Sequence, residues 1–571
     1  MQAKDLQHRK VRIATLPFIN RCLATLGVRQ RLEGMLCSAR YAAAIELLIK
    51  SMLIEPAALY RVPAWAQQFD PIERGVAPLT DDGLGRALDR LFQADRATLQ
   101  TTLTLAAIER FAIDVSQIHS DSTSVKFSGV YAAQSRKGVY LTRGHSKDHR
   151  PDLKQLLYNV SIARDGAVPI HFKTHAGNQT DDTLHIENWL TLRRLVGGAG
   201  FLYVADSKLC TTANMRRIDQ EHGRFVTIVP RTRAETHAFA TDCYEATVRW
   251  DPLLRRRSTR RRGLYDVFAV ASETYQLEEG FRLYWYRSSE KRKRDASSRK
   301  DRLEIARHKL AALNEKKARG RRTERSLLKQ AHQIIARYQV APWLTVTVSH
   351  RVKETFTQTS RGKPSLASTY HRTVKHIPQL MFQQDPEQLA RAKAIDGIFP
   401  LVTNTSLSAK AVLEAYKYQP HIEKRFSGLK SDFQVAPVFL KNNERIEALM
   451  LVVYLADLVA ALIQRDLRRA MEKSGIRILR TLPEERPTST PTWEQVQRLF
   501  AQHCRYEILR DGKVVRTFWD ELSEPQHQVL RLLKIPQHQF GAKKPAMHEG
   551  QKNTHFQVRN VGYIFNVKLN R

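Results

Sequence analysis

The spacing of hydrophobic residues changes near residue 115 of this 571-residue chain. Before that point, apolar residues recur at the three- and four-residue spacing of a helix, as at Leu84, Ala87 and Leu88. After it, short apolar runs typical of strands cover residues 117–127, 156–162, 168–174, 201–205 and 225–229. The pattern predicts a helical N-terminal domain over 1–115 and a sheet from 116 onward.

Helical spacing returns between the later strands, at residues 184–195 and 211–222. An Asp165-Gly166 step separates the second and third strands, and this dipeptide is typical of a hairpin turn. Antiparallel strands followed by α/β alternation are the pattern of an RNase-H-like fold, an assignment that rests partly on analogy. We expect the first part of an α/β, RNase-H-like catalytic core at 116–240.

A long basic stretch of mixed character follows, over residues 241–395. Strand-like runs lie at 244–250, 263–272, 281–287, 343–348 and 370–380, and a charged helical stretch covers 289–340 with an interruption at Gly320. Basic runs at 255–262 and 291–294 either contact phosphate or are solvated tips and faces, and we favour DNA contact. We expect a β-rich, partly helical insertion domain here.

The α/β pattern resumes at residue 396. It predicts a strand at 397–404, a helix at 409–430 that Pro420 kinks or restarts, and a long apolar helix at 444–473. The long helix contains Glu447 and Asp457, which are costly inside a membrane, so we expect a core helix and no membrane partner. Residues 396–480 would complete the core, and 481–571 would form a C-terminal module.

The charge of the chain points to a polyanionic partner. Lysine and arginine number 93 against 57 acidic residues, a formal net charge of +36, and nucleic acid is the polyanion that fits. The N-terminal helices are then either a DNA-binding helix-turn-helix or a packing and dimerisation bundle. The five cysteines are scattered without a Cys-x-x-Cys pair, which argues against a zinc knuckle and favours a reducing cytoplasm.

Three acidic residues occupy positions that suit metal chemistry. Asp121 lies in the first predicted strand, Asp206 directly follows the fourth, and Glu423 lies on a predicted helix. Carboxylate oxygens are ligands that Mg²⁺ prefers, and two such ions can hold the attacking and leaving oxygens of a phosphodiester. Taken singly, each acid is more often a cap or a turn residue.

The sequence frames around these acids resemble the DDE transposases of bacterial insertion sequences, in the IS-four superfamily. That superfamily has a Tyr-(2)-Arg-(3)-Glu-(6)-Lys signature. It is matched here by Tyr416, Glu423 and Lys430, with Gln419 in the place of the arginine. Further segments are similar to the IS-sixteen-thirty-four branch, namely 144–155, 59–65, 129–131 and 176–181.

This resemblance implies an RNase-H-like core with an insertion before the glutamate, and cut-and-paste DNA transposition. Asp121, Asp206 and Glu423 would be catalytic and would bind two Mg²⁺ ions, with Mn²⁺ substituting. The substrate would be double-stranded DNA, comprising the transposon ends with their terminal inverted repeats and the target. Because synapsis brings two ends together, the resemblance also implies a homodimer. The compartment would be the prokaryotic cytoplasm, at the nucleoid.

The resemblance also names DNA contacts. Tyr416, Gln419 and Lys430 would hold phosphate, and because Gln419 is uncharged, the nearby Lys417, Lys424 and Arg425 are cations that could compensate.

Several other residues have both a possible DNA-binding role and a simpler structural one. His145, Lys147 and Arg150 form either a basic loop on the DNA backbone or a surface turn, and Lys208 either touches phosphate or neutralises the acids. Trp285 and Trp343 either receive a flipped base or pack within the inserted sheet, and packing is the more frequent situation.

Two other functions are compatible with the same residues. One is a non-catalytic DNA-binding protein derived from a decayed or domesticated transposase, which Gln419 favours and the intact acidic triad opposes. The other is an RNase-H-like nuclease without joining activity, which would bind the same metals but lack specific end binding and strand transfer.

Overall fold

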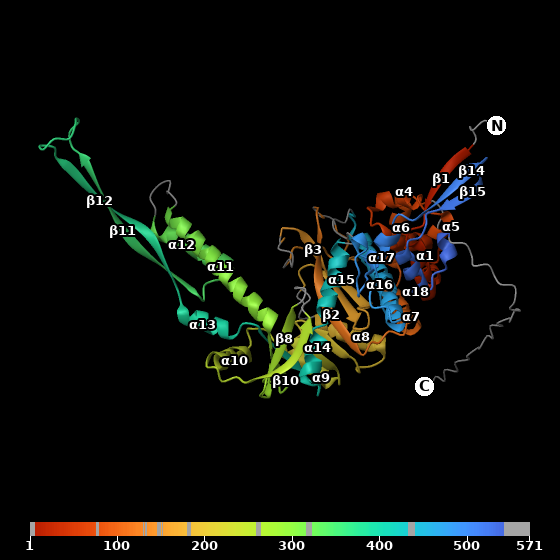
Figure 1. Ribbon diagram of the computed structural model, residues 1–571, viewed down its shortest axis with the longest axis horizontal. Helices are drawn as coiled ribbons and strands as arrows, with labels where there is room; N and C mark the ends of the chain where they lie inside the picture. The colour runs from red at the N-terminus through yellow and green to blue at the C-terminus, as the bar shows by residue number, and fades with distance from the viewer. Residues whose placement is uncertain are drawn as a thin grey trace. The chain divides into compact units, whose positions relative to one another are not determined.

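The computed structural model describes residues 6–75, 79–129, 131, 134–144, 150, 152–179, 184–257, 264–315, 323–431 and 440–541 (Figure 1). The chain forms two compact units. The smaller consists of Met1–Asn20, Gln67–Arg74 and Asp466–Arg571, and the larger of Arg21–Ala66 and Gly75–Arg465.

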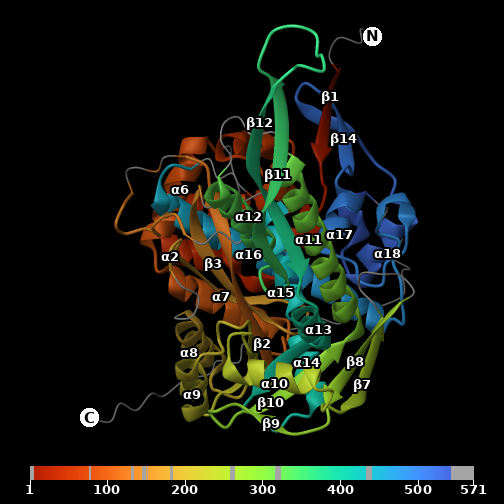
Figure 2. The ribbon, with the colours of Figure 1, turned by 90° about the vertical axis from the view of Figure 1, so that its left-hand side faces the viewer.

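A mixed sheet of ten strands organises the described part of the larger unit (Figure 2). Its order is β4-β3-β2-β5-β6-β13-β10-β8-β7, with β9 paired to β10. The strands are β2 (Gln117–Phe127), β3 (Lys154–Ala163), β4 (Pro169–Ala176), β5 (Leu202–Ala205), β6 (Arg224–Ile228), β7 (Trp250–Arg257), β8 (Tyr265–Ala271), β9 (Tyr275–Gln276), β10 (Arg282–Ser288) and β13 (Ile398–Thr403). β5 runs parallel to both β2 and β6, and the other pairs are antiparallel. The five predicted strands between 117 and 229 are thereby confirmed, as is the hairpin at Asp165-Gly166.

Helices cover both faces of this sheet, which is why β2 and β3 are buried along almost their whole length. On one face, Asn188 of α8 (Leu184–Val196) donates hydrogen bonds to Ser120 and Ser161. On the other face, Tyr454 of α16 (Asn443–Lys473) stacks on Phe172 of β4 with a centroid distance of 4.7 Å. The predicted helices at 184–195 and 444–473 are therefore confirmed.

The helix α16 is long and apolar enough to cross a membrane, but 94% of its most apolar 18-residue window is buried inside the protein. The Tyr454 hydroxyl lies 2.8 Å from that of Thr104 on α7 (Arg96–Arg110), so the helix packs as part of the core. The remaining helices that flank the sheet or precede it are α1 (Leu16–Leu26), α2 (Val28–Leu36), α3 (Ala39–Ile54), α4 (Val62–Ala66), α5 (Pro71–Arg74), α6 (Asp81–Gln93), α9 (Thr212–Gln220) and α10 (Ala234–Tyr244).

The segment expected to be a separate insertion domain instead continues the main sheet at its start. β10 pairs with β13 on one side and with β8 on the other, so β7, β8 and β10 extend the core sheet. The strand predicted at 244–250 is wrong, because α10 ends at Tyr244 and β7 begins only at Trp250. What stands apart is α11 (Ser289–Glu315), α12 (Glu324–Tyr338), the two-stranded sheet of β11 (Leu344–Gln358) and β12 (Tyr370–Gln384), and α13 (Pro386–Ala394).

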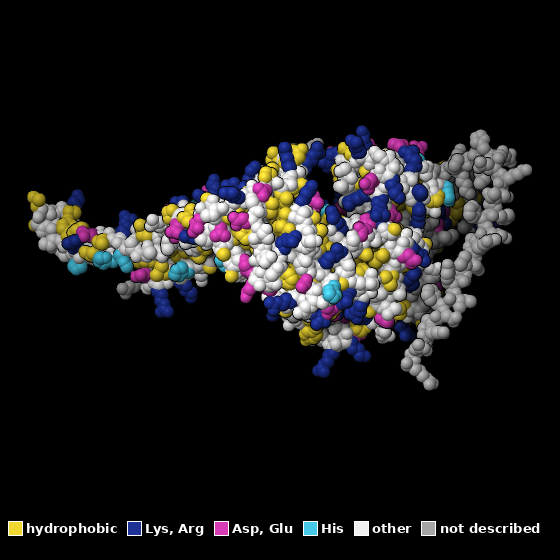
Figure 3. Space-filling view, turned by 90° about the horizontal axis from the view of Figure 1, so that it is seen from below, with side chains coloured by type: hydrophobic (Ala, Val, Ile, Leu, Met, Phe, Trp, Pro, Cys, Tyr) yellow, Lys and Arg dark blue, Asp and Glu magenta, His cyan; other side chains and the backbone are white. Residues whose placement is uncertain are grey.

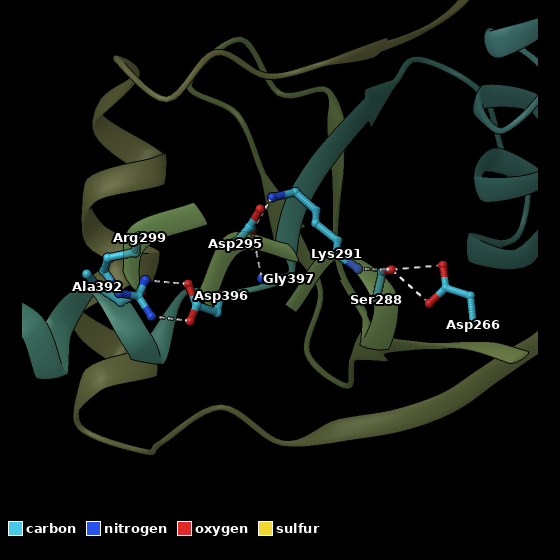
Figure 4. Close-up of polar contacts among 8 residues, drawn as sticks. All are labelled: Asp266, Ser288, Lys291, Asp295, Arg299, Ala392, Asp396 and Gly397. Atoms are coloured by element: carbon cyan, nitrogen blue, oxygen red, sulfur yellow. Dashed lines mark hydrogen bonds and ion pairs between the residues drawn. The ribbon is translucent and has the colours of Figure 1, made fainter. Parts of the chain in front are cut away.

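Polar contacts fasten this inserted part to the sheet (Figure 4). Both guanidinium Nη atoms of Arg299 donate to the carboxylate of Asp396, at 2.7 and 2.6 Å, and each side chain is only 7% exposed. Asp295 accepts from the Gly397 amide at 3.1 Å, and Ser288 donates to Asp266 at 2.8 Å. The start of α11 is therefore held rigidly at the end of β10.

The smaller unit contains a strand within the predicted helical N-terminal domain. β1 (Leu6–Arg12) pairs with β14 (Cys504–Arg510), which also pairs with β15 (Lys513–Trp519). β1 is missed by hydrophobic periodicity because its residues are exposed, apart from its last two. Helices α17 (Trp493–Phe500) and α18 (Glu524–Leu532) complete this unit, and Phe18 packs edge-on to Phe500 at 5.0 Å. The described N- and C-terminal segments thus fold together, unlike the division at 115 and 481 that the sequence predicts.

Candidate active site

Asp121 and Asp206 occupy neighbouring positions in the middle of the sheet. β2 and β5 are parallel, with His119 opposite Val204. Continuing this register by two residues brings Asp206, the first residue after β5, level with Asp121 on the neighbouring strand. Adjacent strands lie about 4.8 Å apart, so the backbones of the two residues lie close together, while the Asp206 carboxylate contacts His185 of α8.

The carboxylate of Asp206 is held in place from two sides. Its Oδ1 accepts a hydrogen bond from the backbone N–H of Lys208 at 3.1 Å and lies 3.4 Å from Nε2 of the buried His185. The side chain is still 36% exposed, so it remains accessible to a ligand.

Glu423 approaches the same region on a helix that proline restarts. α14 (Ala409–Tyr416) ends before Pro420, which opens α15 (Pro420–Ser431) as its first residue, where a missing N–H costs nothing. The expected break at Pro420 is therefore confirmed. α15 packs against β2 and β3, and Glu423 is exposed in its first turn.

Gln419 links this helical segment to the strand that carries Asp121. Its side chain is 7% exposed; Nε2 donates to the carbonyl of Ser120 at 3.1 Å, and Oε1 lies 2.8 Å from Nδ1 of His119. Gln117 contacts the other imidazole nitrogen at 2.8 Å. The residue that replaces the signature arginine is thus packed inside the protein and positions the Glu423 helix on β2.

The charges of all three acids act on one phenol, that of Tyr416. Burial raises the pKa of Tyr416, and the negative charges of Asp206, Asp121 and Glu423 raise it further, in that order. Burial likewise raises the pKa of Tyr203 to about 12, and the charges of Asp206 and Asp121 add to the effect. Tyr203 and Tyr416 are therefore both within range of the charges of Asp206 and Asp121, and Tyr416 is also within range of Glu423.

This donor set fits divalent cations in its chemistry, although the carboxylates are not drawn together. Among the described residues, no three His, Cys, Asp or Glu side chains are gathered closely enough to ligate one metal ion. Asp121 and Asp206 lie on or directly after neighbouring strands, whereas Glu423 is exposed in the first turn of α15. Hard cations that keep several waters are suited to such a partly open set of oxygens.

A group of cations lies around Lys417, the residue that follows Tyr416. Burial lowers the pKa of Lys417 to about 8, and the charges of Arg256, Arg294 and Lys291 lower it further while Asp266 opposes them. The Lys417 ammonium also lies 4.7 Å from the ring centre of Phe268. Both basic runs identified in the sequence therefore contribute to one positive region next to Tyr416.

The remaining sequence candidates occupy varied surroundings, and their DNA-binding roles stay predictions. Lys208 and Lys424 are exposed. Arg425 instead turns inward, donating to the Ala167 carbonyl at 3.0 Å and pairing with Asp457 at 3.3 Å. Arg150 is exposed and paired with Asp152. His145, Lys147 and the side chain of Lys430 lie outside the described residues.

The two tryptophans differ in accessibility. Trp285 is 2% exposed, and its ring stacks on Phe239 at a centroid distance of 3.9 Å and an angle of 2°, so a base cannot reach it in this structure. Of the two roles predicted for Trp285, packing within the sheet is the one that matches this structure. Trp343 is half-buried, with the Arg302 guanidinium 5.1 Å from its ring centre.

His119 and Gln117 were missed by sequence reasoning. Both lie two residues apart on one face of β2, ahead of Asp121, and their polarity in an otherwise buried strand was the available signal. A buried polar residue requires a partner, which Gln419 supplies.

Comparisons with known proteins do not identify a family for this chain, so the functional assignment depends on the candidate site. No protein-family description and no curated protein match the chain. Among solved structures it is similar to a cryo-EM structure of the piggyBac transposase synaptic complex with hairpin DNA. The TM-score is 0.36 and the identity 8%, over 87% of this chain and 82% of that chain.

Proposed function

We propose that this protein is a DDE-type DNA transposase that binds the terminal inverted repeats of its element, cuts there and joins the ends to target DNA. The observation that supports the proposal is that Asp121, Asp206 and Glu423, which lie far apart in the sequence, all lie near enough to Tyr416 for their charges to raise its pKa. The triad was expected from sequence frames that lie far apart in the chain.

The sheet order supports an RNase-H-like core. The antiparallel strands β2, β3 and β4 lie on one side, and β5 and β6 follow in parallel on the other side of β2, with helices on both faces. Asp121 lies within β2, and Asp206 directly follows the neighbouring strand β5.

Each group has a defined task in the proposed reaction. Asp121, Asp206 and Glu423 would hold Mg²⁺, or Mn²⁺ in its place. The bound metal would supply an activated water and stabilise the leaving oxygen. Gln419 and His119 link the start of the glutamate helix to β2, and Lys417 with its neighbouring arginines would hold DNA phosphate. Two DNA ends require two such sites, which favours a homodimer in the synaptic complex.

The deciding experiment is cleavage of a labelled duplex that carries the repeats flanking the gene, with Mg²⁺ or with EDTA. The native protein and Glu423→Gln are compared, and Glu414→Gln, an exposed glutamate on α14, is the matched control. We expect Mg²⁺-dependent cutting by the native protein and the control, and none by Glu423→Gln. Cutting by Glu423→Gln would remove this residue from the site, and tight binding without cutting by the native protein would indicate a non-catalytic DNA-binding protein.

A further inference from the structure

The β11–β12 ribbon, formed by the antiparallel strands β11 and β12, is long relative to the core that supports it. Each strand has 15 residues, which is about 50 Å at roughly 3.4 Å per residue. Only its base is covered: Leu344, Val348 and Leu380 pack on apolar side chains of α11 and α12. The pairs from Ser349–Gln379 to Gln358–Tyr370 extend beyond this cluster, and Figure 1 shows the ribbon continuing past both helices.

The two faces of the ribbon differ because successive side chains alternate between them. The face that begins at Thr345 and Gln383 will be called the polar face. It consists of Thr345, Thr347, Ser349, Arg351, Lys353, Thr355, Thr357, His371, Thr373, Lys375, Ile377, Gln379, Met381 and Gln383. It contains hydroxyls, amides and cations but no carboxylate. The sole acid of either strand, Glu354, lies on the opposite face and pairs with Arg372.

One pairing within the polar face is unfavourable for the free protein. Lys353 and Lys375 stand directly opposite each other, both exposed, and Arg351 is two residues away on the same strand. Like charges in directly opposed positions destabilise an antiparallel pair. Charged residues also protect exposed strand edges from aggregation, but a mixture of positive and negative residues would serve that purpose equally well. A face with cations alone is complementary to a polyanion.

The dimensions of the uncovered part match the major groove of DNA. The ten pairs from Ser349 onward span about 34 Å, close to one turn of the duplex, and a two-stranded ribbon fits a groove roughly 12 Å wide. Threonine hydroxyls and glutamine amides can bond base edges there, and apolar groups such as those of Ile377 and Met381 can contact thymine methyls. Cationic and histidine side chains lie along the extended hairpin at the left of Figure 3.

We infer that the β11–β12 ribbon is a DNA-binding arm whose polar face enters the major groove, with Arg351, Lys353 and Lys375 reaching the flanking phosphates. This inference rests on the part of the proposed function that makes DNA the partner. It does not depend on the Asp121 site or on cleavage.

The test measures binding of the full chain to a 40-base-pair mixed-sequence duplex between 0.05 and 0.3 M NaCl, without divalent metal. The variant Arg351→Gln/Lys353→Gln/Lys375→Gln is compared with Arg325→Gln/Lys329→Gln/Arg337→Gln. The second variant removes three exposed cations from α12 in the same inserted part, so the net charge changes equally.

Each phosphate contact contributes about 0.9 to the slope of log K against log salt, so three lost contacts should reduce the slope by about 2.7. At 0.15 M salt the affinity of the ribbon variant should fall roughly 100-fold, whereas that of the α12 variant should change little. The major-groove ligand methyl green should displace the native protein, and the minor-groove ligand netropsin should not.

Equal losses in the two variants, or no loss in either, would overturn the inference, as would displacement by netropsin alone. A change in the monomer–dimer equilibrium of the ribbon variant with unaltered DNA affinity would assign the ribbon to a second copy of the chain instead. Binding with the expected slope change but without Mg²⁺-dependent cutting would support the arm and refute the proposed catalysis.

Discussion

The neighbourhood of Asp121 and the β11–β12 ribbon use polar residues in opposite ways. Near Asp121, the side chains of His119 and Gln419 are buried and bonded to each other. On the polar face of the ribbon the polar side chains are exposed and cationic, and Lys353 faces another lysine. Burial fixes geometry, which metal chemistry requires, whereas exposed charge provides attraction that tolerates movement. Under the proposed function, the first region would cut DNA and the second would bind it.

The largest expected effect comes from Asp121→Asn, which tests the buried side of this comparison. Loss of one carboxylate should reduce Mg²⁺-dependent cleavage by at least about 1,000-fold, equal to roughly 4 kcal/mol of transition-state stabilisation. DNA affinity should stay within about twofold in a gel-shift measurement, as should that of the control Asp301→Asn on α11. Cleavage within tenfold of the native rate would exclude Asp121 as a metal ligand.

A second test breaks the attachment of the inserted part. Arg299→Met leaves Asp396 buried without its partner, and this should lower the free energy of unfolding by about 3–5 kcal/mol. Chemical denaturation measures the loss, and the double variant Arg299→Met/Asp396→Leu should recover most of it because no unpaired charge remains. A single-variant loss below about 1 kcal/mol would contradict a tightly buried pair.

The buried network also predicts a dependence on pH. Burial lowers the pKa of His119 from its ordinary 6.5 to about 4, so the unfolded chain takes up a proton before the folded protein does. The His119 contribution to stability is therefore complete above pH 6.5 and is lost as the pH falls toward 4. Between pH 7 and 5 this amounts to about 2 kcal/mol in the free energy of unfolding. His119→Asn should remove that part of the difference, and an unchanged pH profile would show that His119 is solvated.

The smallest effect is expected on the ribbon. Arg372→Gln breaks the exposed pair with Glu354, whose side chains are 59% and 38% exposed, and should change the free energy of unfolding by less than about 1 kcal/mol. Measuring Arg372→Gln and Arg299→Met together compares how much an exposed and a buried arginine–carboxylate pair contribute to the free energy of unfolding. A loss similar to that of Arg299→Met would mean that the ribbon is packed in solution.

Local sequence patterns predict most of the helices and strands, but they do not predict which strands pair with one another. Apolar alternation located β2 to its observed ends, and Pro420 marked the break before α15, because both are properties of a few adjacent residues. The pairing of β10 with β13 was not predictable, since nothing in either strand encodes a partner more than a hundred residues away. For the same reason β7 to β10 were assigned to a separate domain.

The candidate site shows the same limit. The sequence frames singled out Asp121, Asp206 and Glu423 and noted Gln419 as a departure from the signature. That departure suggested a weakened DNA contact, whereas the Gln419 side chain bonds His119 and Ser120 inside the protein. A side chain's direction depends on how α14 and α15 pack, which the spacing of Tyr416, Gln419 and Glu423 alone does not determine.

The position of β13 has a consequence for chains that are still being synthesised. This strand lies between β6 and β10, so the sheet cannot close until the ribosome has released residue 403, and Glu423 emerges later still. The ribbon, by contrast, is already complete at Gln384. A nascent or truncated product would thus acquire its proposed DNA-binding arm before its proposed cutting centre. Such fragments would compete with the finished protein for DNA without cleaving it.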